Sequence, residues 1–381
     1  MKPNPVIYLD YNSTTPVDKQ VLDAMLPYFT EKCGNASSRT HRLGWTADEA
    51  VKKARTQVSD LINALEQEII FTSGATEAIN LGIKGVFESY ASKGDHIVTV
   101  ATEHKAVLDT CKGLENKGAR VTYLPVDTAG SINLHELEKS ITDKTVLVCA
   151  MFANNETGLI HPVKEIAEIV HRKKSLFFCD ATQAVGKIPV DIIKHRIDLM
   201  SISAHKLYGP KGVGALFVRR KDPRVTLTGQ QSGGGHERGL RSGTLNVTGI
   251  VGLGKACEIA QQEMNEDEKR ISALRDLLEK ELTASGNISV NGSVISRLPN
   301  TSNLTFKRIK ADKLISKIPE LAIATGSACT SALPEPSHVL KAMNVSDDAA
   351  YSSVRFSLGK FTTREEIEKT IELLRKALSK L

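Results

Sequence analysis

The stretch SLFFCDATQAVGKIPVDIIKHRIDLMSISAHKLYGPKGVGALFV, residues 175–218, decides the fold of this protein. Three short apolar runs lie within it, at 175–180, 197–203 and 214–218. Each run has the length and the apolar character of a strand. The first two runs end in polar residues, so side chains that can bind a ligand or react lie at the ends of predicted strands.

Four more apolar runs precede this stretch, and segments with helical periodicity separate most of the seven. The runs are 68–72, 96–100, 120–124 and 145–151, and helices are expected at about 76–91, 105–117, 133–140 and 162–173. Thr46 and Glu49 have the spacing of a capping box, which predicts that an earlier helix begins there. Strand–helix alternation predicts a mainly parallel sheet covered on both faces. We therefore expect an α/β fold with a seven-stranded sheet.

The pattern changes after Asn246. A long stretch rich in Glu and Lys is predicted to be helical to about Ser285 and to bridge into a second domain. Short strands are then expected at 289–290, 301–306 and 354–358, with a closing amphipathic helix at about 363–380. Since 381 residues exceed the usual size of a single core, we expect two domains. The predicted large domain is 13–260, and residues 1–12 and 261–381 form a smaller α+β domain.

The composition is ordinary for a globular chain, with 41% hydrophobic residues, 25% charged residues and a net charge of +6. Lys and Arg are scattered among Asp and Glu, which argues against a dedicated nucleic-acid surface. No apolar run reaches the ~20 residues that cross a bilayer, and the start of the chain lacks the features of a secretion signal or a transit peptide. We therefore expect a cytoplasmic protein that contacts neither membranes nor nucleic acid directly.

The six cysteines form no C-x-x-C pair and no short metal-ligand spacing, so neither a disulfide framework nor a resident metal is predicted. Cys149 and Cys179 lie in strand-like runs, where a cysteine behaves as a small hydrophobic residue. Cys329 differs, because the small residues of Ala324–Ala332 surround it and are typical of a mobile loop.

Ligands of open α/β sheets bind beyond the carboxyl ends of the strands. Ser73-Gly74-Ala75-Thr76-Glu77 follows one predicted strand and opens a helix. Free backbone N–H groups and the helix dipole favour an anion there, such as a phosphate. Simple helix capping is the alternative role of this turn.

Asp180 ends another strand, and a buried carboxylate there needs a partner. It either caps the following segment or pairs with a protonated pyridine nitrogen, as pyridoxal phosphate requires. Gln183 lies three residues further on and is expected to reach the same ligand.

Lys206 follows a third strand end, directly after Ser203-Ala204-His205. Most lysines are solvated at the surface. At the edge of the sheet, desolvation and nearby cations would lower the pKa of the Lys206 amine and prepare it to form a Schiff base. Ser203 and His205 are candidate phosphate ligands. Lys187 and Lys211 are weaker candidates, because neither directly follows a strand.

His104 and Asn155 also follow apolar strands. His104 is suited to stacking on a cofactor ring or to proton transfer, the alternative being an ordinary helix-start residue; for Asn155 the alternative is turn chemistry. Arg355 lies in a strand-like segment and either grips a carboxylate through two parallel hydrogen bonds or forms a structural salt bridge. Gly233–Gly239 lacks the G-x-G-x-x-G spacing of a dinucleotide loop and predicts a backbone turn ahead of Thr244.

Together, Asp180, Ser203–Lys206 and the Ser73–Glu77 turn resemble the fold-type I pyridoxal-phosphate enzymes of aminotransferase class V. From about residue 6 to the C-terminus the chain is most similar to the NifS/IscS-type cysteine desulfurases. The matching segments are Tyr8–Pro16, Thr72–Asn80, Glu103–Val107, Asp180–Gln183, His205–Gly212, Gly233–Thr244, Gly326–Ser331 and Val354–Gly359. The Cys329 loop is the most discriminating segment, because aminotransferases of this fold lack it. Asn12-Ser13 stands where Ser-Ala is more usual, and Ala324-Thr325 where Ser-Ser is common.

The resemblance implies a role for each matching residue. Lys206 would bind pyridoxal phosphate as a Schiff base, Asp180 would pair with the pyridinium nitrogen, and His104 would stack on the ring and transfer protons. Gln183 and Asn155 would face the phenolic oxygen.

For the phosphate, the resemblance implies Ala75, Thr76, Ser203 and His205, with Thr244 contributed by the neighbouring subunit of a homodimer. For the substrate carboxylate it implies Arg355 and Asn35.

The activity implied is removal of sulfur from L-cysteine, which gives L-alanine and a persulfide on Cys329. The acceptor would be an iron–sulfur scaffold or a tRNA-thiolation carrier, and Cys329 could transiently ligate an iron–sulfur cluster. The family's C-terminal tail, implicated in docking the scaffold, has no counterpart after Leu381, which leaves the acceptor open. The closest alternatives are a selenocysteine lyase and a cysteine sulfinate desulfinase. A plain aminotransferase has no use for Cys329, and a non-catalytic sulfur carrier or scaffold none for Lys206.

Overall fold

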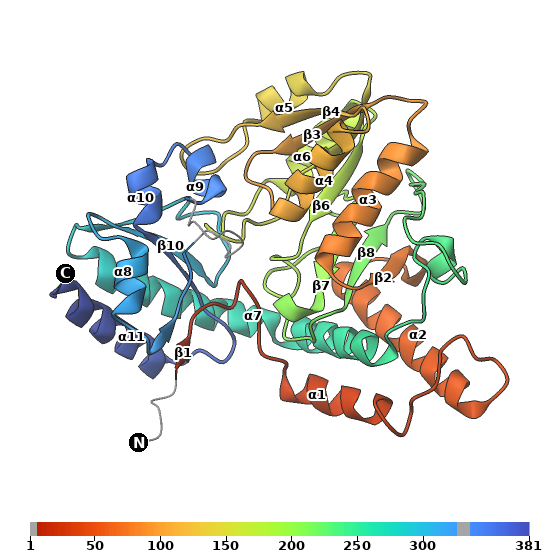
Figure 1. Cartoon of the computed structure of the whole chain (residues 1–381), viewed down its shortest axis with the longest axis horizontal. Coiled ribbons are helices and arrows are strands. Elements are labelled where there is room, and N and C mark those ends of the chain that lie inside the picture. Colours follow the sequence, from red (N-terminus) through yellow and green to blue (C-terminus); the bar gives the residue numbers. More distant parts are fainter. Residues whose placement is uncertain (1–5, 326–335, 381) are drawn as a thin grey trace.

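The computed structural model describes residues 6–325 and 336–380. Its largest element is a seven-stranded sheet in the order β2-β8-β7-β6-β5-β3-β4 (Figure 1). The strands are β2 (Ile69–Thr72), β3 (His96–Val100), β4 (Arg120–Leu124), β5 (Thr145–Cys149), β6 (Leu176–Asp180), β7 (Leu199–Ser203) and β8 (Gly214–Val218). Strand β8 is antiparallel to both of its neighbours, and the other pairs are parallel. The predicted α/β class with a mainly parallel seven-stranded sheet is confirmed.

Helices cover both faces of this sheet, because each presents one apolar face to it. The helices that follow strands are α3 (Ala75–Ser89), α4 (Lys105–Glu115), α5 (Leu134–Ser140) and α6 (Val163–Arg172). Residues of α3 and α4 form one apolar cluster with the sheet. Residues of α1 (Lys19–Met25), α2 (Arg42–Ile62), α5 and α6 form the other. The cores therefore lie on the two sides of the strands, and the strand ends remain open for a ligand.

The predicted start of the second helix at Thr46 is wrong. Helix α2 begins at Arg42, and its N-cap is His41, whose Nδ1 accepts the N–H of Gly44 at 3.2 Å. Thr46 therefore lies inside the helix. A capping box requires non-helical backbone at its first residue, and the imidazole of His41 already caps the chain one turn earlier.

The C-terminal third builds a second, smaller layer. Strands β12 (Ser353–Ser357), β10 (Thr301–Phe306) and β9 (Ile288–Val290) form an antiparallel sheet, and β1 (Ile7–Tyr8) pairs in parallel with β11 (Leu321–Ala322). The helices of this part are α8 (Ala311–Ser316), α9 (His338–Ala342), α10 (Asp347–Tyr351) and α11 (Arg364–Leu378). A third apolar cluster unites Leu9 with residues between Ile271 and Ala377, so the start of the chain packs with its end.

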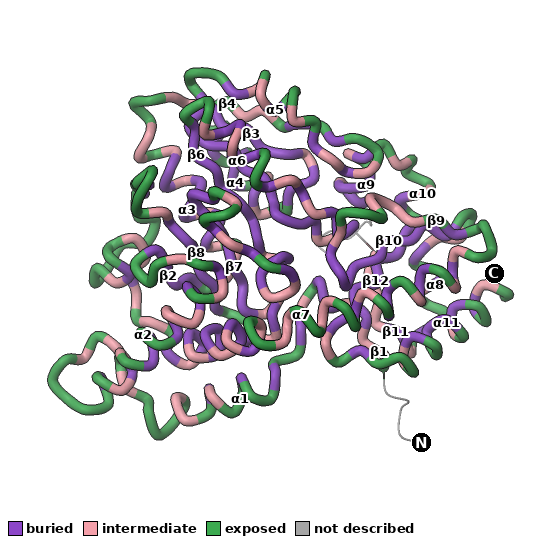
Figure 2. Tube along the Cα trace, turned by 180° about the vertical axis from the view of Figure 1, so that it is seen from behind, coloured by how far each residue is buried: buried purple, intermediate pink, exposed green. Residues whose placement is uncertain are grey.

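Helix α7 (Val247–Thr283) connects the two layers as a continuous rod (Figure 1). Its apolar residues from Val247 to Ile259 belong to the core of the large sheet, and those from Ile271 to Leu282 belong to the third cluster. Buried segments run through both layers in Figure 2. We keep the division into 13–260 and 1–12 with 261–381 as a proposal that fits these clusters. No helix in the described part of the chain is long and apolar enough to cross a bilayer.

His161 gives the fold a predictable sensitivity to acid. Its side chain is buried, and neither ring nitrogen has a hydrogen-bond partner among the described residues. Burial lowers the pKa of His161 to about 4, below the value of about 6.5 in an unfolded chain. Above pH ~6.5 the ring is neutral in both the folded and the unfolded protein, so its burial costs no protonation energy. As the pH falls towards 4, the unfolded chain binds a proton that the folded protein does not, and stability is lost.

We expect the free energy of unfolding to fall by about 2 kcal/mol between pH 7 and pH 5 through this residue alone. His161→Leu should lack that share of the acid sensitivity. Urea unfolding of both proteins at the two pH values measures the difference. Equal acid sensitivity of the two proteins would contradict the assignment.

Candidate active site

A cavity of about 1180 Å³ opens at the carboxyl ends of β2, β3, β5, β6 and β7. The small layer closes its other side with Asp10, Asn12–Thr14, Ile315, Ile323–Thr325, Pro336–His338 and Arg355. The volume exceeds that of a typical single-ligand pocket, so a cofactor and a small substrate fit together. Ten of the predicted site residues line it: Ala75, Thr76, His104, Asn155, Asp180, Gln183, Ser203, His205, Lys206 and Arg355.

Lys206 closes the short helical turn η3 (Ala204–Lys206) that directly follows β7. Its Nζ donates to the carbonyl oxygens of Asn12 at 2.5 Å and Ser13 at 2.7 Å. Burial, followed by the nearby charge of Arg355, lowers the pKa of Lys206 to about 8. About a tenth of the amine is therefore unprotonated at pH 7, far more than for an ordinary lysine, and an attacking or proton-accepting lysine requires this form.

Asp180 is buried at the end of β6. Its Oδ1 accepts hydrogen bonds from the backbone N–H of Thr182 at 3.0 Å, the Thr182 hydroxyl at 2.5 Å and the Ser201 hydroxyl at 2.7 Å. None of the described residues donates to Oδ2. The carboxylate is thus held rigidly by one oxygen while the other remains available to a cationic ligand in the cavity.

The N-terminus of α3 faces the cavity, and no side chain caps it. Gly74 occupies the N-cap position, at φ 149°, and the first N–H groups of the helix have no side-chain acceptor. Ser203 lies beside this turn, with its Oγ 3.7 Å from the position that a Cβ on Gly74 would take. Since orphan N–H groups need an acceptor, this end of the helix fits a phosphate and argues against the simple-cap alternative.

His205 lies on the same wall, with its Nδ1 3.2 Å from the Thr14 hydroxyl. Burial and the charges of Lys206, Lys211 and Lys187 lower the pKa of His205 to about 4. The ring is therefore neutral near pH 7 and acts as a hydrogen-bonding group rather than as a cation.

His104 is the N-cap of α4, and its Nδ1 accepts the N–H of Ala106 at 3.1 Å. The ring stands on the cavity wall with Nε2 left for a ligand. The surrounding protein lowers the pKa of His104 by desolvation, and Asp180 opposes this shift. A neutral imidazole with one committed nitrogen is suited to passing protons at the other.

Glu103 was not predicted as a site residue. It is buried, its Oε1 accepts the N–H of Met151 at 2.5 Å, and its Oε2 has no partner among the described residues. Burial, then the charge of Asp180, raises the pKa of Glu103 well above its ordinary value. Burial therefore favours the protonated form of Glu103, which precedes His104 in the chain but does not itself line the cavity. A glutamate that directly follows a buried strand was the signal that could have indicated it.

Asn12 organises the floor of the cavity and was also missed as a site residue. Its Oδ1 accepts from Lys187 Nζ at 3.2 Å and Asn300 Nδ2 at 3.0 Å. Gln183 donates to its carbonyl oxygen at 2.9 Å and accepts from Lys187 Nζ at 2.5 Å. Burial and the charges of Lys206 and Arg355 lower the pKa of Lys187 well below its ordinary value. Lys187 thus supports the site from beneath without lining the cavity.

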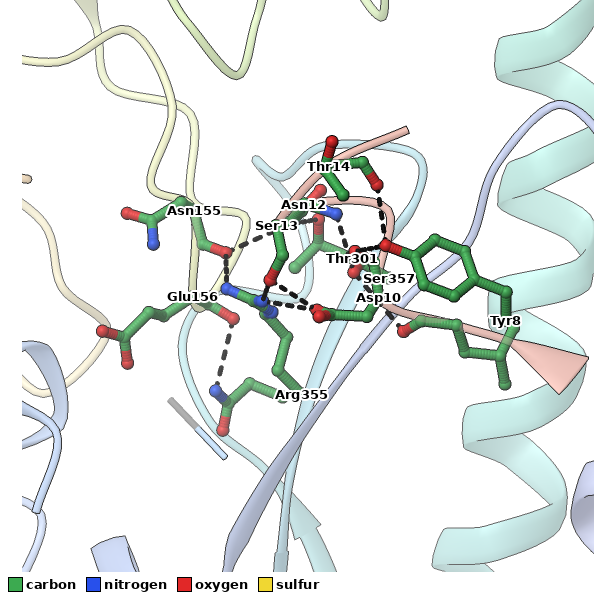
Figure 3. Close-up of polar contacts among 12 residues, drawn as sticks. Tyr8, Asp10, Asn12, Ser13, Thr14, Asn155, Glu156, Thr301, Arg355 and Ser357 are labelled. Carbon is green, nitrogen blue, oxygen red and sulfur yellow. Dashed lines mark hydrogen bonds and ion pairs between the residues drawn. The ribbon is translucent and has the colours of Figure 1, made fainter. Parts of the chain in front are cut away.

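Arg355 projects from β12 into a network that Figure 3 shows. Its Nη1 donates to the carbonyl oxygen of Asn155 at 3.1 Å. Its Nη2 donates to Asp10 Oδ1 at 2.6 Å and to Ser13 Oγ at 2.7 Å. The salt bridge that was one of two predicted roles is therefore present, and it faces the same cavity as Lys206.

Two predicted residues do not line the cavity. Thr244 is exposed and lies outside the cavity lining. Asn35 is exposed in a turn, where its Oδ1 accepts the N–H of Ser37 at 2.9 Å. Asn35 does not line the cavity of this chain, and its role at a substrate carboxylate beside Arg355 stays a prediction.

Cys329 lies outside the described residues. The described residues on either side of it are tied to the cavity. Ala324 exchanges backbone hydrogen bonds with Arg355, at 2.7 and 3.3 Å, and the Ser337 hydroxyl donates to Glu156 Oε2 at 2.5 Å. Thr325 and Pro336 both line the cavity. The described residues that precede and follow 326–335 therefore lie at the cavity.

Comparisons with known proteins agree on one relationship. The sequence model of the Aminotransferase class-V family matches residues 7–370. A cysteine desulfurase IscS of Anaeromyxobacter sp. (strain Fw109-5) is 52% identical over 376 residues, 98% of this chain and 93% of the relative. The cysteine desulfurase IscS of Neisseria meningitidis serogroup C / serotype 2a is 50% identical over 375 residues, with the same coverage of 98% and 93%.

Solved structures extend this likeness to three dimensions. A NifS-like protein with 39% sequence identity superposes with a TM-score of 0.92, covering 99% of this chain and 100% of that one. A NifS-like protein from Rickettsia africae, at 31% identity, superposes with a TM-score of 0.87 over 98% of this chain and 99% of that one.

The lowered pKa of Lys206 predicts its reactivity in the protein freed of any bound aldehyde. Its rate of acetylation should rise with pH and level off above about pH 9, since the amine is then unprotonated. Lys19 is the control, because its side chain is 86% exposed and Asp23 raises its pKa. Peptide mass spectrometry after brief labelling measures both rates. Parallel pH profiles for the two lysines would show that Lys206 is not desolvated.

Proposed function

Because this chain belongs to the aminotransferase class-V family, and within it to the cysteine desulfurases, we propose that its cavity binds pyridoxal phosphate and L-cysteine and that Cys329 receives the sulfur. The observation that carries the proposal is a convergence. A lysine amine with a pKa of about 8, a carboxylate with one free oxygen and an uncapped helix terminus meet in one cavity.

The residues present fit pyridoxal phosphate. The α3 N-terminus, with Thr76, Ser203 and His205, offers donors for the phosphate. Asp180 Oδ2 offers an anionic partner for the ring nitrogen, and Lys206 is the attachment point for the aldehyde carbon. When bound, the cofactor supplies an electron sink for the substrate Cα.

The remaining work falls to side chains of this chain. Arg355 binds the substrate carboxylate and so orients the Cα–H bond towards Lys206. Lys206 Nζ accepts the Cα proton and, with a pKa of about 8, can also return one. On the part of the cavity wall where α4 begins, His104 Nε2 is the group that passes protons. Gln183 and Asn155 border the phenolic side of the ring.

The sulfur transfer itself is balanced between two thiols. The thiolate of Cys329 attacks the sulfur of L-cysteine, a new S–S bond forms, and the Cβ–S bond breaks. The carbon fragment leaves as L-alanine after it takes up protons, and the enzyme retains a persulfide. The tethering of the flanking Ala324 and Ser337 at the cavity supports this reach. The persulfide then serves an acceptor protein in iron–sulfur cluster assembly or tRNA thiolation.

We also propose that the protein acts as a homodimer in the cytoplasm. The exposure of Thr244, away from its own cavity, supports a role at the phosphate of a second subunit. Leu22, Leu26, Phe29 and Trp45 are large exposed apolar residues on and near α1 and α2, where a subunit contact would cover them. The five described cysteines are free, as the reducing cytoplasm favours.

Two variants separate cofactor binding from sulfur transfer. Lys206→Ala should lose both the visible absorbance of bound cofactor and activity, because it removes the attachment point. Cys329→Ser should keep that absorbance and lose at least roughly a hundredfold in sulfide production from L-cysteine, because it removes the nucleophile. Spectra and a sulfide and alanine assay measure both.

Cys33→Ser is the matched control, since Cys33 is an exposed free cysteine remote from the cavity. It should retain full activity. Undiminished sulfide production by Cys329→Ser would refute the role of that cysteine.

The homodimer predicts a particle with twice the 41.4 kDa mass of the chain. Thr244→Val should weaken pyridoxal phosphate binding about tenfold, because it removes one hydrogen bond to a charged group. Analytical ultracentrifugation gives the mass, and cofactor titration gives the affinity. A monomer that binds the cofactor as tightly as the wild type would exclude a contribution from a second subunit.

A further inference from the structure

We propose that Asp10 and Ser13 act as an internal substitute for the substrate carboxylate at Arg355, so that an amino acid binds by displacing them. The inference rests on the proposed function of Arg355 and concerns what sets its affinity. Figure 3 shows Asp10 and Ser13 against the guanidinium, on a turn that also carries Asn12 and Thr14.

The occupancy of Nη2 carries the inference. Its two N–H groups already donate to Asp10 Oδ1 at 2.6 Å and Ser13 Oγ at 2.7 Å. A guanidinium offers a carboxylate two parallel N–H groups along the Nε–Nη2 edge or along the Nη1–Nη2 edge, and both edges include Nη2. An incoming carboxylate can therefore grip Arg355 with two hydrogen bonds only when Asp10 or Ser13 gives up its own.

The rest of the guanidinium is prepared for such an exchange. Its Nε is buried and has no acceptor among the described residues, and Nη1 donates to the carbonyl oxygen of Asn155 at 3.1 Å. The Arg355 side chain is only 7% exposed, so an unpaired N–H there is costly. A carboxylate on the Nε–Nη2 edge satisfies that donor, which Asp10 and Ser13 leave unpaired.

Asp10 and Ser13 are able to yield while the turn stays in place. The Asp10 side chain is 22% exposed, and Ser13 is exposed. The backbone is held independently, because the Tyr8 hydroxyl donates to the carbonyl oxygens of Asp10 at 3.1 Å and Thr14 at 2.9 Å. The Ser13 hydroxyl donates to Asp10 Oδ1 at 2.8 Å, so the two side chains form one acceptor unit.

Electrostatic repulsion between carboxylates also favours the displacement of Asp10. An α-carboxylate on Arg355 would lie beside the carboxylate of Asp10, and two like charges at hydrogen-bonding distance repel. Exchange is therefore favoured over simultaneous binding. The net free energy of amino-acid binding is therefore the free energy gained from the contact with Arg355 minus the free energy needed to displace Asp10 and Ser13.

The test is the binding of L-alanine, the amino-acid product of the proposed reaction, to the cofactor-loaded enzyme. L-alaninamide is the control ligand, because a neutral amide replaces its carboxylate. Isothermal calorimetry gives both affinities for the wild type and for Ser13→Ala, Ser13→Thr, Asp10→Asn and Arg355→Lys. For each protein, the ratio of the L-alanine affinity to the L-alaninamide affinity isolates the carboxylate contact from any general change in the site.

We expect Ser13→Ala and Asp10→Asn to bind L-alanine about three- to tenfold more tightly, because each weakens the competing acceptor. The affinity for L-alaninamide should stay within about twofold. Ser13→Thr keeps the hydroxyl and should restore the wild-type ratio. Arg355→Lys should lose the preference for L-alanine, since an ammonium has no two-pronged edge.

Weaker L-alanine binding by both Ser13→Ala and Asp10→Asn would overturn the proposal and make the two residues supports of Arg355. A wild type that does not prefer L-alanine over L-alaninamide would overturn it as well. Failure of the proposed desulfuration is a separate result, seen as absent sulfide from L-cysteine, and involves no measurement used here. Should Asp10→Asn fail to fold, the exposed Ser13 pair decides the outcome alone.

Discussion

Three basic side chains converge at one cavity, and a single turn, Asp10–Thr14, stabilises all of them. Lys206 donates to the carbonyl oxygens of Asn12 and Ser13, Lys187 donates to Asn12 Oδ1, and Arg355 donates to Asp10 and Ser13. Desolvated amines and a guanidinium this close together are tolerated only when such acceptors are fixed in advance. The site depends on this turn for its geometry.

The turn also holds the two layers together. Its backbone pairs with β12 through Tyr11 and Ser357, and Thr15, directly after the turn, pairs with His205 of η3, which follows β7. A displacement of either layer would therefore move the lysine and the arginine relative to each other. Substrate orientation needs both groups at a set separation, so the contact between the layers is part of the chemistry.

Two features of the cavity attract anions. Burial lowers the pKa of His205 and raises that of Glu103, so it favours the neutral form of both groups. Glu156, beside Arg355, has a pKa raised to about 7 by burial. Beside Asp10 and Asp180, the cavity presents the uncapped terminus of α3 and the guanidinium of Arg355. These match the phosphate and the carboxylate of the proposed ligands.

The sequence alone determined the seven strands, the helices between them and the residues that follow the strand ends, because hydrophobic periodicity and strand-end position are local properties. Lys206, Asp180 and the α3 turn were predictable for that reason. The tertiary structure decided the rest. The pairing of Asp10 with Arg355 joins residues 345 positions apart, and the roles of Asn12, Lys187 and Glu103 arise from burial by distant segments. It also decided that Asn35 does not line the cavity and that α2 begins at Arg42, with His41 as its N-cap, rather than at Thr46, since caps and contacts depend on which neighbours the fold supplies.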